Sequence, residues 1–105
     1  MHRGEVWWAQ IPKPVGKRPV VLLSRTKAIT VRQFVTVAEI STTIRKIPVE
    51  VPLGQEDGLP KACVANLDVI NTIPKKFLVK HICKLSNEKI SEIENALKFA
   101  LGLEQ

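Results

Sequence analysis

Arg18 is the residue whose type and position most clearly suggest chemistry. It stands in the segment 16–25, where a basic loop is followed directly by an apolar run of valine and leucine. Pro19 has no backbone N–H and therefore suits the first residue of a strand. A guanidinium that leaves a loop where a rigid strand begins would be held in place and could bind a phosphate. The alternative is a solvated loop cation with no specific role.

Three hydroxyl side chains in a row form the second candidate site. Ser41, Thr42 and Thr43 stand at the end of an expected strand, and Arg45 and Lys46 follow at once. Hydroxyl groups at strand ends often bond the backbone and shape a turn, which is a purely structural role. The basic pair beside the hydroxyls leaves the alternative of a functional site open.

The balance of charges favours a polyanionic partner. The chain carries 16 Lys and Arg against 10 Asp and Glu, a formal net charge of +6. Such a surface attracts nucleic acid or an acidic protein. Lys13 and Lys17 stand with Arg18 in the loop before the apolar run, so part of this charge is concentrated there.

The cysteines and histidines do not form a metal-binding pattern. Cys63 and Cys83 are 20 residues apart, and neither belongs to a Cys-x-x-Cys pair. We therefore expect two free, partly buried thiols and no metal or other cofactor. A zinc site built from the two cysteines and His81 is the weaker alternative.

These candidate residues are positioned mainly by strands. Alternating apolar residues and a high content of β-branched and aromatic types predict strands along most of the chain, while 25–32 is either an irregular connection or the start of the next strand. Two prolines mark the segment 48–53 as an edge strand. A slip in the alternation near Leu67 predicts a bulge, and Asp68 follows inside this apolar stretch. The predicted strands are 3–11, 19–24, 33–40, 48–53, 62–73 and 77–85.

Two adjacent tryptophans and one helix complete the pattern. Trp7 and Trp8 must face opposite sides of their strand, so one faces the core and the other faces solvent, a subunit contact or RNA. Ser86 is an expected N-cap, and apolar residues at helical spacing up to Leu101 predict a core-packing helix that Gly102 ends.

The order of several strands followed by one helix predicts an α+β fold. We expect a small, curled or barrel-like antiparallel sheet closed by the C-terminal helix, in one domain over residues 1–105. No apolar stretch approaches the length of a membrane span, and the polar start of the chain lacks the apolar core of a secretion signal. We therefore expect a cytoplasmic protein with no membrane partner.

Five segments follow one another in an order that resembles a known family. They are 3–7 (RGEVW), 18–22 (RPVVL), 37–42 (VAEIST), 58–60 (GLP) and 68–73 (DVINTI). Together with the C-terminal helix, they resemble the MazF/PemK/Kid family of toxin endoribonucleases over nearly the whole chain. The resemblance implies an SH3-like twisted barrel of five or six strands that forms a homodimer.

The resemblance also implies an activity and partners. The activity is metal-independent cleavage of single-stranded RNA at a short sequence, in which the RNA's own 2′-OH attacks the adjacent phosphorus and leaves a 2′,3′-cyclic phosphate. The regulator is an antitoxin whose acidic C-terminal tail occupies the RNA groove. The net charge of +6 is compatible with both partners.

Site residues follow from the same resemblance. Arg18 matches the family's catalytic arginine and would bind the scissile phosphate. Ser41, with Thr42 beside it, aligns with the catalytic threonine and would bond a non-bridging oxygen, while Asp68 matches an acidic position that acts as acid or base in some relatives. The residues expected to bind RNA beside these are Lys13, Lys17, Arg25, Thr43, Arg45 and Lys46.

The chain departs from the family pattern in three places. The loop before Arg18 is shorter than in the best-known members. Ser41 replaces the usual threonine, so the hydroxyl role could instead fall to Thr42 or Thr43. Asn66 stands where some relatives have an arginine two residues before the acid, which leaves the acid–base assignment open and keeps His81 as a candidate contributor.

Two other functions fit the sequence less well. A related fold, the CcdB type, poisons DNA gyrase through its C-terminal helix, and Phe99 with Leu103 could form such a patch, although we expect them to cover the edge of the core. A plain nucleic-acid-binding SH3-like module is allowed by the charge alone.

Overall fold

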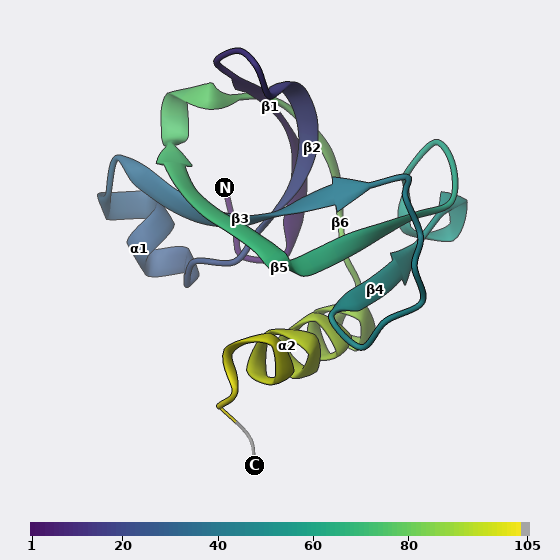
Figure 1. Cartoon of the computed structure of the whole chain (residues 1–105). Coiled ribbons are helices and arrows are strands. Elements are labelled where there is room, and N and C mark those ends of the chain that lie inside the picture. The colour runs from purple at the N-terminus through teal and green to yellow at the C-terminus, as the bar shows by residue number, and fades with distance from the viewer. Residues whose placement is uncertain (104–105) are drawn as a thin grey trace.

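The computed structural model describes residues 1–103, and in it a six-stranded sheet is combined with two α-helices and two short 3-10 turns. Figure 1 shows the sheet curling into a half-barrel, with α2 packed below β4 and β5 and α1 beside the start of β3. The elements in chain order are β1 (Glu5–Ile11), β2 (Gly16–Leu22), α1 (Thr26–Val31), β3 (Phe34–Ser41), β4 (Glu50–Leu53), η1 (Gln55–Asp57), β5 (Cys63–Pro74), η2 (Lys75–Phe77), β6 (Leu78–Lys84) and α2 (Asn87–Leu101).

The strand order is β4-β5-β3-β2-β1-β6, and every neighbouring pair is antiparallel. This confirms the predicted fold class and places β4 at an edge, where its proline is tolerated. The predicted bulge is also confirmed. Ala38 pairs with Ile70 whereas the next residue, Glu39, pairs with Asn66, so residues 67–69 of β5 have no partner in β3.

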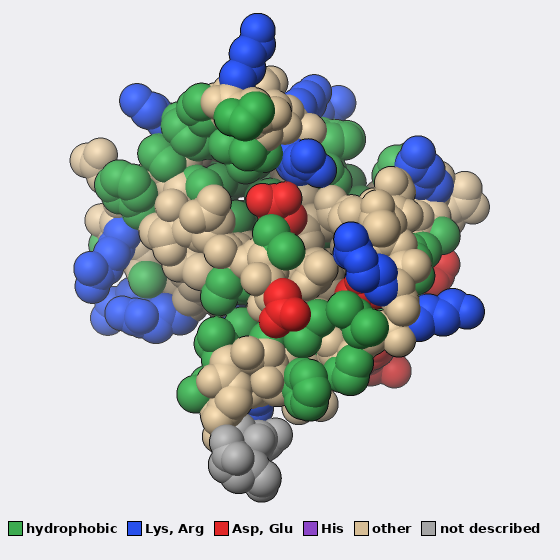
Figure 2. Space-filling view, in the orientation of Figure 1, with side chains coloured by type: hydrophobic (Ala, Val, Ile, Leu, Met, Phe, Trp, Pro, Cys, Tyr) green, Lys and Arg blue, Asp and Glu red, His purple; other side chains and the backbone are tan. Residues whose placement is uncertain are grey.

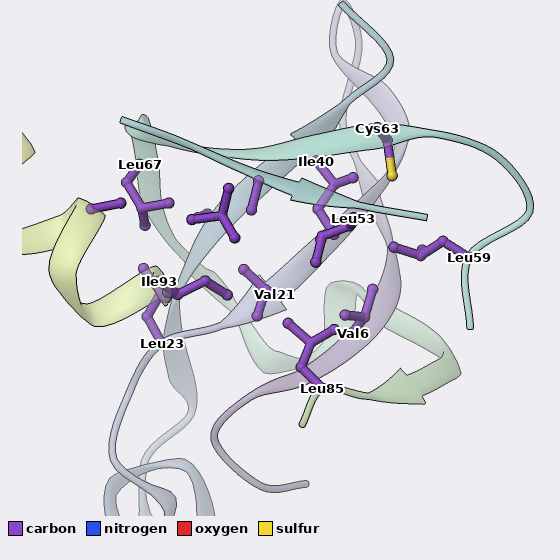
Figure 3. Packing of buried hydrophobic residues seen from close by; sticks show 14 residues of the cluster. Val6, Val21, Leu23, Ile40, Leu53, Leu59, Cys63, Leu67, Leu85 and Ile93 are labelled. Atoms are coloured by element: carbon purple, nitrogen blue, oxygen red, sulfur yellow. The ribbon is translucent and has the colours of Figure 1, made fainter. Parts of the chain in front are cut away.

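Strand alternation gives the curled sheet an apolar core on each face. The first core cluster includes Val6, Val21, Ile40 and Leu67, and α2 covers it with Ile93 and Ala96 (Figure 3). The second core cluster lies on the other face and is built from Ala9, Val20, Leu22, Ile29, Val35, Val37, Ile73 and Leu78. Trp7 packs against the second cluster, as expected for one of the two tryptophans.

Helix α2 forms as the sequence predicts. The Ser86 hydroxyl caps it by accepting the Lys89 N–H at 3.2 Å, and Gly102 ends it in the left-handed region at φ 67°. The prediction for Phe99 and Leu103 is wrong, because these side chains are 59% and 68% exposed. Phe99 is six residues after Ile93, about 120° away around the helix, and Leu103 follows the helix end.

The predicted start of the second strand differs from the structure by three residues. Strand β2 begins at Gly16 rather than Pro19, so Arg18 lies within the strand opposite Ala9 instead of in a loop before it. Pairing of β2 with β3 starts only at Val20, so the missing N–H of Pro19 falls where β2 has no neighbour on that side.

The segment 25–32 is a helix, not a strand or an irregular connection. Helix α1 buries Ala28 and Ile29, and Ile29 belongs to the second core cluster. The Lys75 ammonium donates to the Ile29 carbonyl at 2.6 Å and supports the helix from η2. Burial against the sheet thus outweighs the low helix propensity of threonine, isoleucine and valine. Among residues 1–103, no helix is both long and apolar enough to cross a membrane.

Candidate functional site

One pocket lies where the start of β2, the end of β3 and the start of β5 come together, beside the hairpin of β1 and β2. Its volume is about 290 Å³. One part of its wall is apolar and another part carries hydroxyl and cationic side chains. The lining residues are Trp8, Lys17, Arg18, Pro19, Ile40, Ser41, Thr42, Thr43, Leu59, Pro60, Lys61 and Cys63. We call this the hydroxyl pocket.

The cationic wall comes from β2. Gly16 adopts φ 80°, a left-handed conformation that glycine accepts without strain, and it pairs with Ile11 where the hairpin closes. Lys17 then lies over the Trp8 ring, with its Nζ 5.1 Å from the ring centroid. Trp8 is therefore the outward tryptophan, and a cation already covers one face of its ring.

The hydroxyl wall is the end of β3. The Thr43 N–H donates to the Ser41 Oγ at 3.0 Å, so a tight turn follows the strand. This bond uses a lone pair of the Ser41 oxygen and leaves its hydrogen free to donate. The structural role that the sequence allowed is therefore present, and it leaves the Ser41 hydroxyl able to donate to an acceptor oxygen.

A buried carboxylate holds the loop after the hydroxyls. Glu50 Oε1 accepts the N–H groups of Arg45 at 2.9 Å and Lys46 at 3.0 Å. The Glu50 side chain is only 2% exposed, and the Arg45 guanidinium is 3.9 Å from its other oxygen. Lys46 has φ 57°, which is uncommon and unfavourable for a non-glycine residue. The hydrogen bond from its N–H to Glu50 therefore stabilises a strained backbone conformation.

The third wall follows η1, and sequence reasoning missed it. Gly58, at φ 102°, packs so closely that an added Cβ would lie 2.7 Å from the Cys83 Cβ, and the chain then turns into the pocket. Leu59 joins the first core cluster, while Lys61 contributes a third cation to the lining. The available signal was a lysine directly after the Gly58-Leu59-Pro60 motif.

Among residues 1–103, the hydroxyl pocket is lined by positive charges and by no negative charge. Its charged lining residues, Lys17, Arg18 and Lys61, are all cations. Burial raises the pKa of the Cys63 thiol, and the nearby Asp57 carboxylate adds to the shift, so this thiol is protonated at neutral pH and is a poor nucleophile. Such a pocket can bind an oxyanion and stabilise added negative charge on it.

Several predicted site residues do not line this pocket. Asp68 lies in the bulge of β5, where its N–H bonds the Asn66 Oδ1 at 2.9 Å, and Arg25 lies beside α1. Lys13 is in the turn of the first hairpin and Arg45 and Lys46 are in the loop held by Glu50. Their roles in acid–base chemistry or RNA binding stay predictions.

Of the remaining metal and acid–base candidates, Cys63 lines the hydroxyl pocket, whereas Cys83 and His81 do not. The His81 ring makes an edge contact with Trp7, with centroids 5.6 Å apart, and does not line the pocket. Both cysteines are free, Cys63 buried and Cys83 half-buried, as expected. Across residues 1–103, no three His, Cys, Asp or Glu side chains are grouped so that they could hold a metal ion.

Known proteins resemble the chain over nearly its whole length. Residues 2–101 match the sequence profile described as "PemK-like, MazF-like toxin of type II toxin-antitoxin system". The "Probable endoribonuclease MazF5" of Mycobacterium tuberculosis is 37% identical over 100 residues, which is 94% of this chain and 91% of the relative.

Two solved structures show the same fold. The Mycobacterium tuberculosis toxin MazF-mt6 superposes with a TM-score of 0.88 at 31% identity, over 96% of this chain and 99% of that one. A mycobacterial endoribonuclease solved in complex with its cognate antitoxin gives a TM-score of 0.89 at 28% identity, over 100% and 98% of the two chains.

Proposed function

The chain belongs to the PemK-like, MazF-like toxins of type II toxin–antitoxin systems, and from this premise we propose that it is a sequence-specific endoribonuclease that cuts single-stranded RNA. The observation that carries the proposal is the hydroxyl pocket, which Arg18 and Ser41 both line and in which every charged lining residue is a cation. Phosphodiesters are the ligands that such a pocket suits best.

The reaction is an internal transesterification. The 2′-oxygen of the RNA forms a bond to the adjacent phosphorus, the bond from phosphorus to the 5′-oxygen breaks, and the proton lost by the 2′-OH is balanced by one gained at the leaving oxygen. The products are a 2′,3′-cyclic phosphate and a 5′-OH end. Because the nucleophile belongs to the substrate, the protein's task is to position the phosphate and to stabilise its added charge.

Three of the pocket residues have a role in this scheme. Arg18 binds the scissile phosphate through its guanidinium fork, and Ser41 donates its hydroxyl hydrogen to a non-bridging oxygen. Thr42, next along the wall, supports the same oxygen. Asp68 as acid or base requires a route to the phosphate from outside the pocket, so an Asp68→Asn variant with normal rates would remove it from the mechanism.

The family also supplies the partners. A related endoribonuclease was solved with its cognate antitoxin, and for this chain we assign a cognate antitoxin whose acidic C-terminal tail enters the cationic pocket. We further assign a homodimer in the cytoplasm. Light scattering that gives the mass of one chain at micromolar concentration would contradict the dimer.

The test is incubation of purified protein with mixed RNA in excess EDTA. We expect fragments with 2′,3′-cyclic phosphate and 5′-OH ends, and mapping those ends on cellular RNA gives the recognised sequence. Folded Arg18→Ala protein is the control for contaminating nucleases. Intact RNA together with inhibition of DNA gyrase would overturn the proposal in favour of the CcdB-type alternative.

A further inference from the structure

A second groove lies at the other end of β3, beside α1. It has a volume of about 690 Å³, and a smaller groove of about 330 Å³ continues it across η2. The two share Arg32, Gln33 and Phe34, so they form one continuous surface. We call it the α1 groove.

Every charged residue that lines the α1 groove is a cation. Arg25 and Arg32 flank α1, and Lys75 and Lys76 line the continuation at η2. Lys75 bonds a backbone carbonyl, but within residues 1–103 none of the four cations pairs with a carboxylate. Figure 2 shows Lys and Arg side chains gathered over the position that α1 has in Figure 1. The groove therefore attracts anions without competition from its own side chains.

The same groove offers a flat apolar face and hydroxyl groups. Phe34 is 56% exposed although it begins a strand whose next apolar residue, Val35, is 1% exposed. The hydroxyls of Thr36 and Thr72 bond each other at 2.8 Å across β3 and β5 and line the groove floor. An exposed aromatic ring beside unpaired cations is the combination that binds single-stranded nucleic acid, because bases stack on the ring and phosphates pair with the cations.

The α1 groove is separate from the hydroxyl pocket but connected to it by one strand. Phe34 and Ser41 are the two ends of β3, which at about 3.3 Å per residue lie about 23 Å apart. The two lining sets share no residue. A strand of RNA longer than the recognised sequence could therefore contact both.

We propose that the α1 groove is a second RNA-binding site, which holds single-stranded RNA flanking the cleavage sequence through phosphate contacts to Arg25 and Arg32 and a base stacked on Phe34. This inference rests on the proposed endoribonuclease function. The sequence analysis expected Arg25 to bind RNA. In this proposal Arg25 binds RNA in the α1 groove, outside the hydroxyl pocket where cleavage takes place. An acidic peptide is the competing occupant, but it has no use for a single exposed ring beside hydroxyls, whereas RNA uses all three features.

The experiment compares two RNAs that share the mapped cleavage sequence. One has about six nucleotides, and the other carries about ten further uridines on each side. The variants are Phe34→Ala and the double variant Arg25→Ala, Arg32→Ala. The matched control is Lys80→Ala, Lys84→Ala on β6, which removes the same charge from residues that line neither groove.

We expect the parent protein to cut the long RNA with a higher kcat/KM than the short one. Phe34→Ala should lower kcat/KM for the long RNA about fivefold or more, as loss of one stacked base does, and leave the short RNA unchanged. The arginine double variant should reduce the slope of log K against log salt by about 1.4 for the long RNA, since each lost phosphate contact is worth about 0.7. The control variant should change neither kcat/KM on the two RNAs nor the salt slope for the long RNA.

Equal losses on both RNAs, or the same loss in the control, would overturn the inference. So would a variant that keeps long-RNA binding but loses binding of a polyglutamate peptide, which would assign the groove to an acidic partner. These failures differ from failure of the proposed function, in which neither RNA is cut by any form of the protein.

Discussion

The two ends of β3 carry two different kinds of surface. At Ser41 the backbone is fixed by a tight turn and by a buried carboxylate, and cations and hydroxyls line a small pocket. At Phe34 the surface is an open groove with exposed cations and an exposed ring. The fixed geometry at the Ser41 end suits catalysis, which needs accurately placed groups. The accessible charge at the Phe34 end suits binding of a flexible polyanion.

The largest effect expected at the Ser41 end is that of Arg18→Ala. A pentacovalent phosphate carries more negative charge than the diester, and losing one preorganised donor to such a charge typically costs about 3–4 kcal/mol, or several hundredfold in rate. The exposed Arg18 contributes little to the core, so the variant should fold, and single-turnover cleavage measures the loss.

Arg18→Lys is the companion variant and should recover only part of the rate, because an ammonium cannot reproduce the guanidinium fork. Folded Arg18→Ala protein that cuts RNA within a few-fold of the parent rate would remove Arg18 from the chemistry and with it the contrast between the two ends of β3.

Ser41→Ala should follow in size. A hydrogen bond to a charged oxygen contributes about 1.5–3 kcal/mol, so we expect a loss of roughly 10- to 150-fold in single-turnover rate. Thr42→Ala is the matched control and should cost less, since the Thr43 N–H orients Ser41 and not Thr42. The reverse order would move the catalytic hydroxyl to Thr42.

Removing the carboxylate of Glu50 tests whether the fixed loop matters. Glu50→Ala leaves two backbone N–H groups without their acceptor, at a cost of about 1–3 kcal/mol each if they stay buried. We expect lower stability in urea and slower cleavage at saturating RNA.

Glu50→Gln keeps one acceptor oxygen and should restore most of the cleavage rate. If Glu50→Ala loses stability but keeps the parent kcat, the carboxylate supports the fold without positioning the hydroxyl wall.

The salt dependence of RNA affinity should differ between the two ends of β3, because it depends on the number of cations that contact phosphates at each end. The three cations of the hydroxyl pocket predict that affinity for a six-nucleotide RNA falls roughly 20-fold between about 50 and 200 mM salt, at about 0.7 per contact. A longer RNA that also reaches the α1 groove should show a steeper fall. Fluorescence anisotropy measures both, and a flat response would contradict a pocket that binds RNA through charge.

The smallest effect belongs to the cysteines. Burial and the Asp57 carboxylate raise the pKa of both thiols, so alkylation by iodoacetamide should be slow at about pH 7 and should accelerate as pH rises. The Cys63→Ser, Cys83→Ser double variant should cut RNA within about two- to threefold of the parent rate, because the nucleophile is the 2′-OH. A folded but inactive double variant would require a different mechanism.

The sequence by itself determined the elements that depend on local periodicity. The edge strand β4, the bulge at residues 67–69 and the capped helix α2 follow from alternation, proline placement and helical spacing, which need no knowledge of distant residues. Arg18 and Ser41 could be singled out as candidates for the same reason, since each stands in a recognisable local motif at an expected strand end.

Tertiary structure decided everything that depends on contacts between distant segments. Helix α1 forms because Ile29 is buried under the sheet, and Lys61 reaches the hydroxyl pocket because the chain after η1 packs against Cys83 of β6 and then turns into the pocket. Arg25 and Asp68, which the sequence grouped with Arg18, lie outside that pocket. Local patterns report which face of an element is apolar, but the neighbour that covers the face is set by packing of the whole chain.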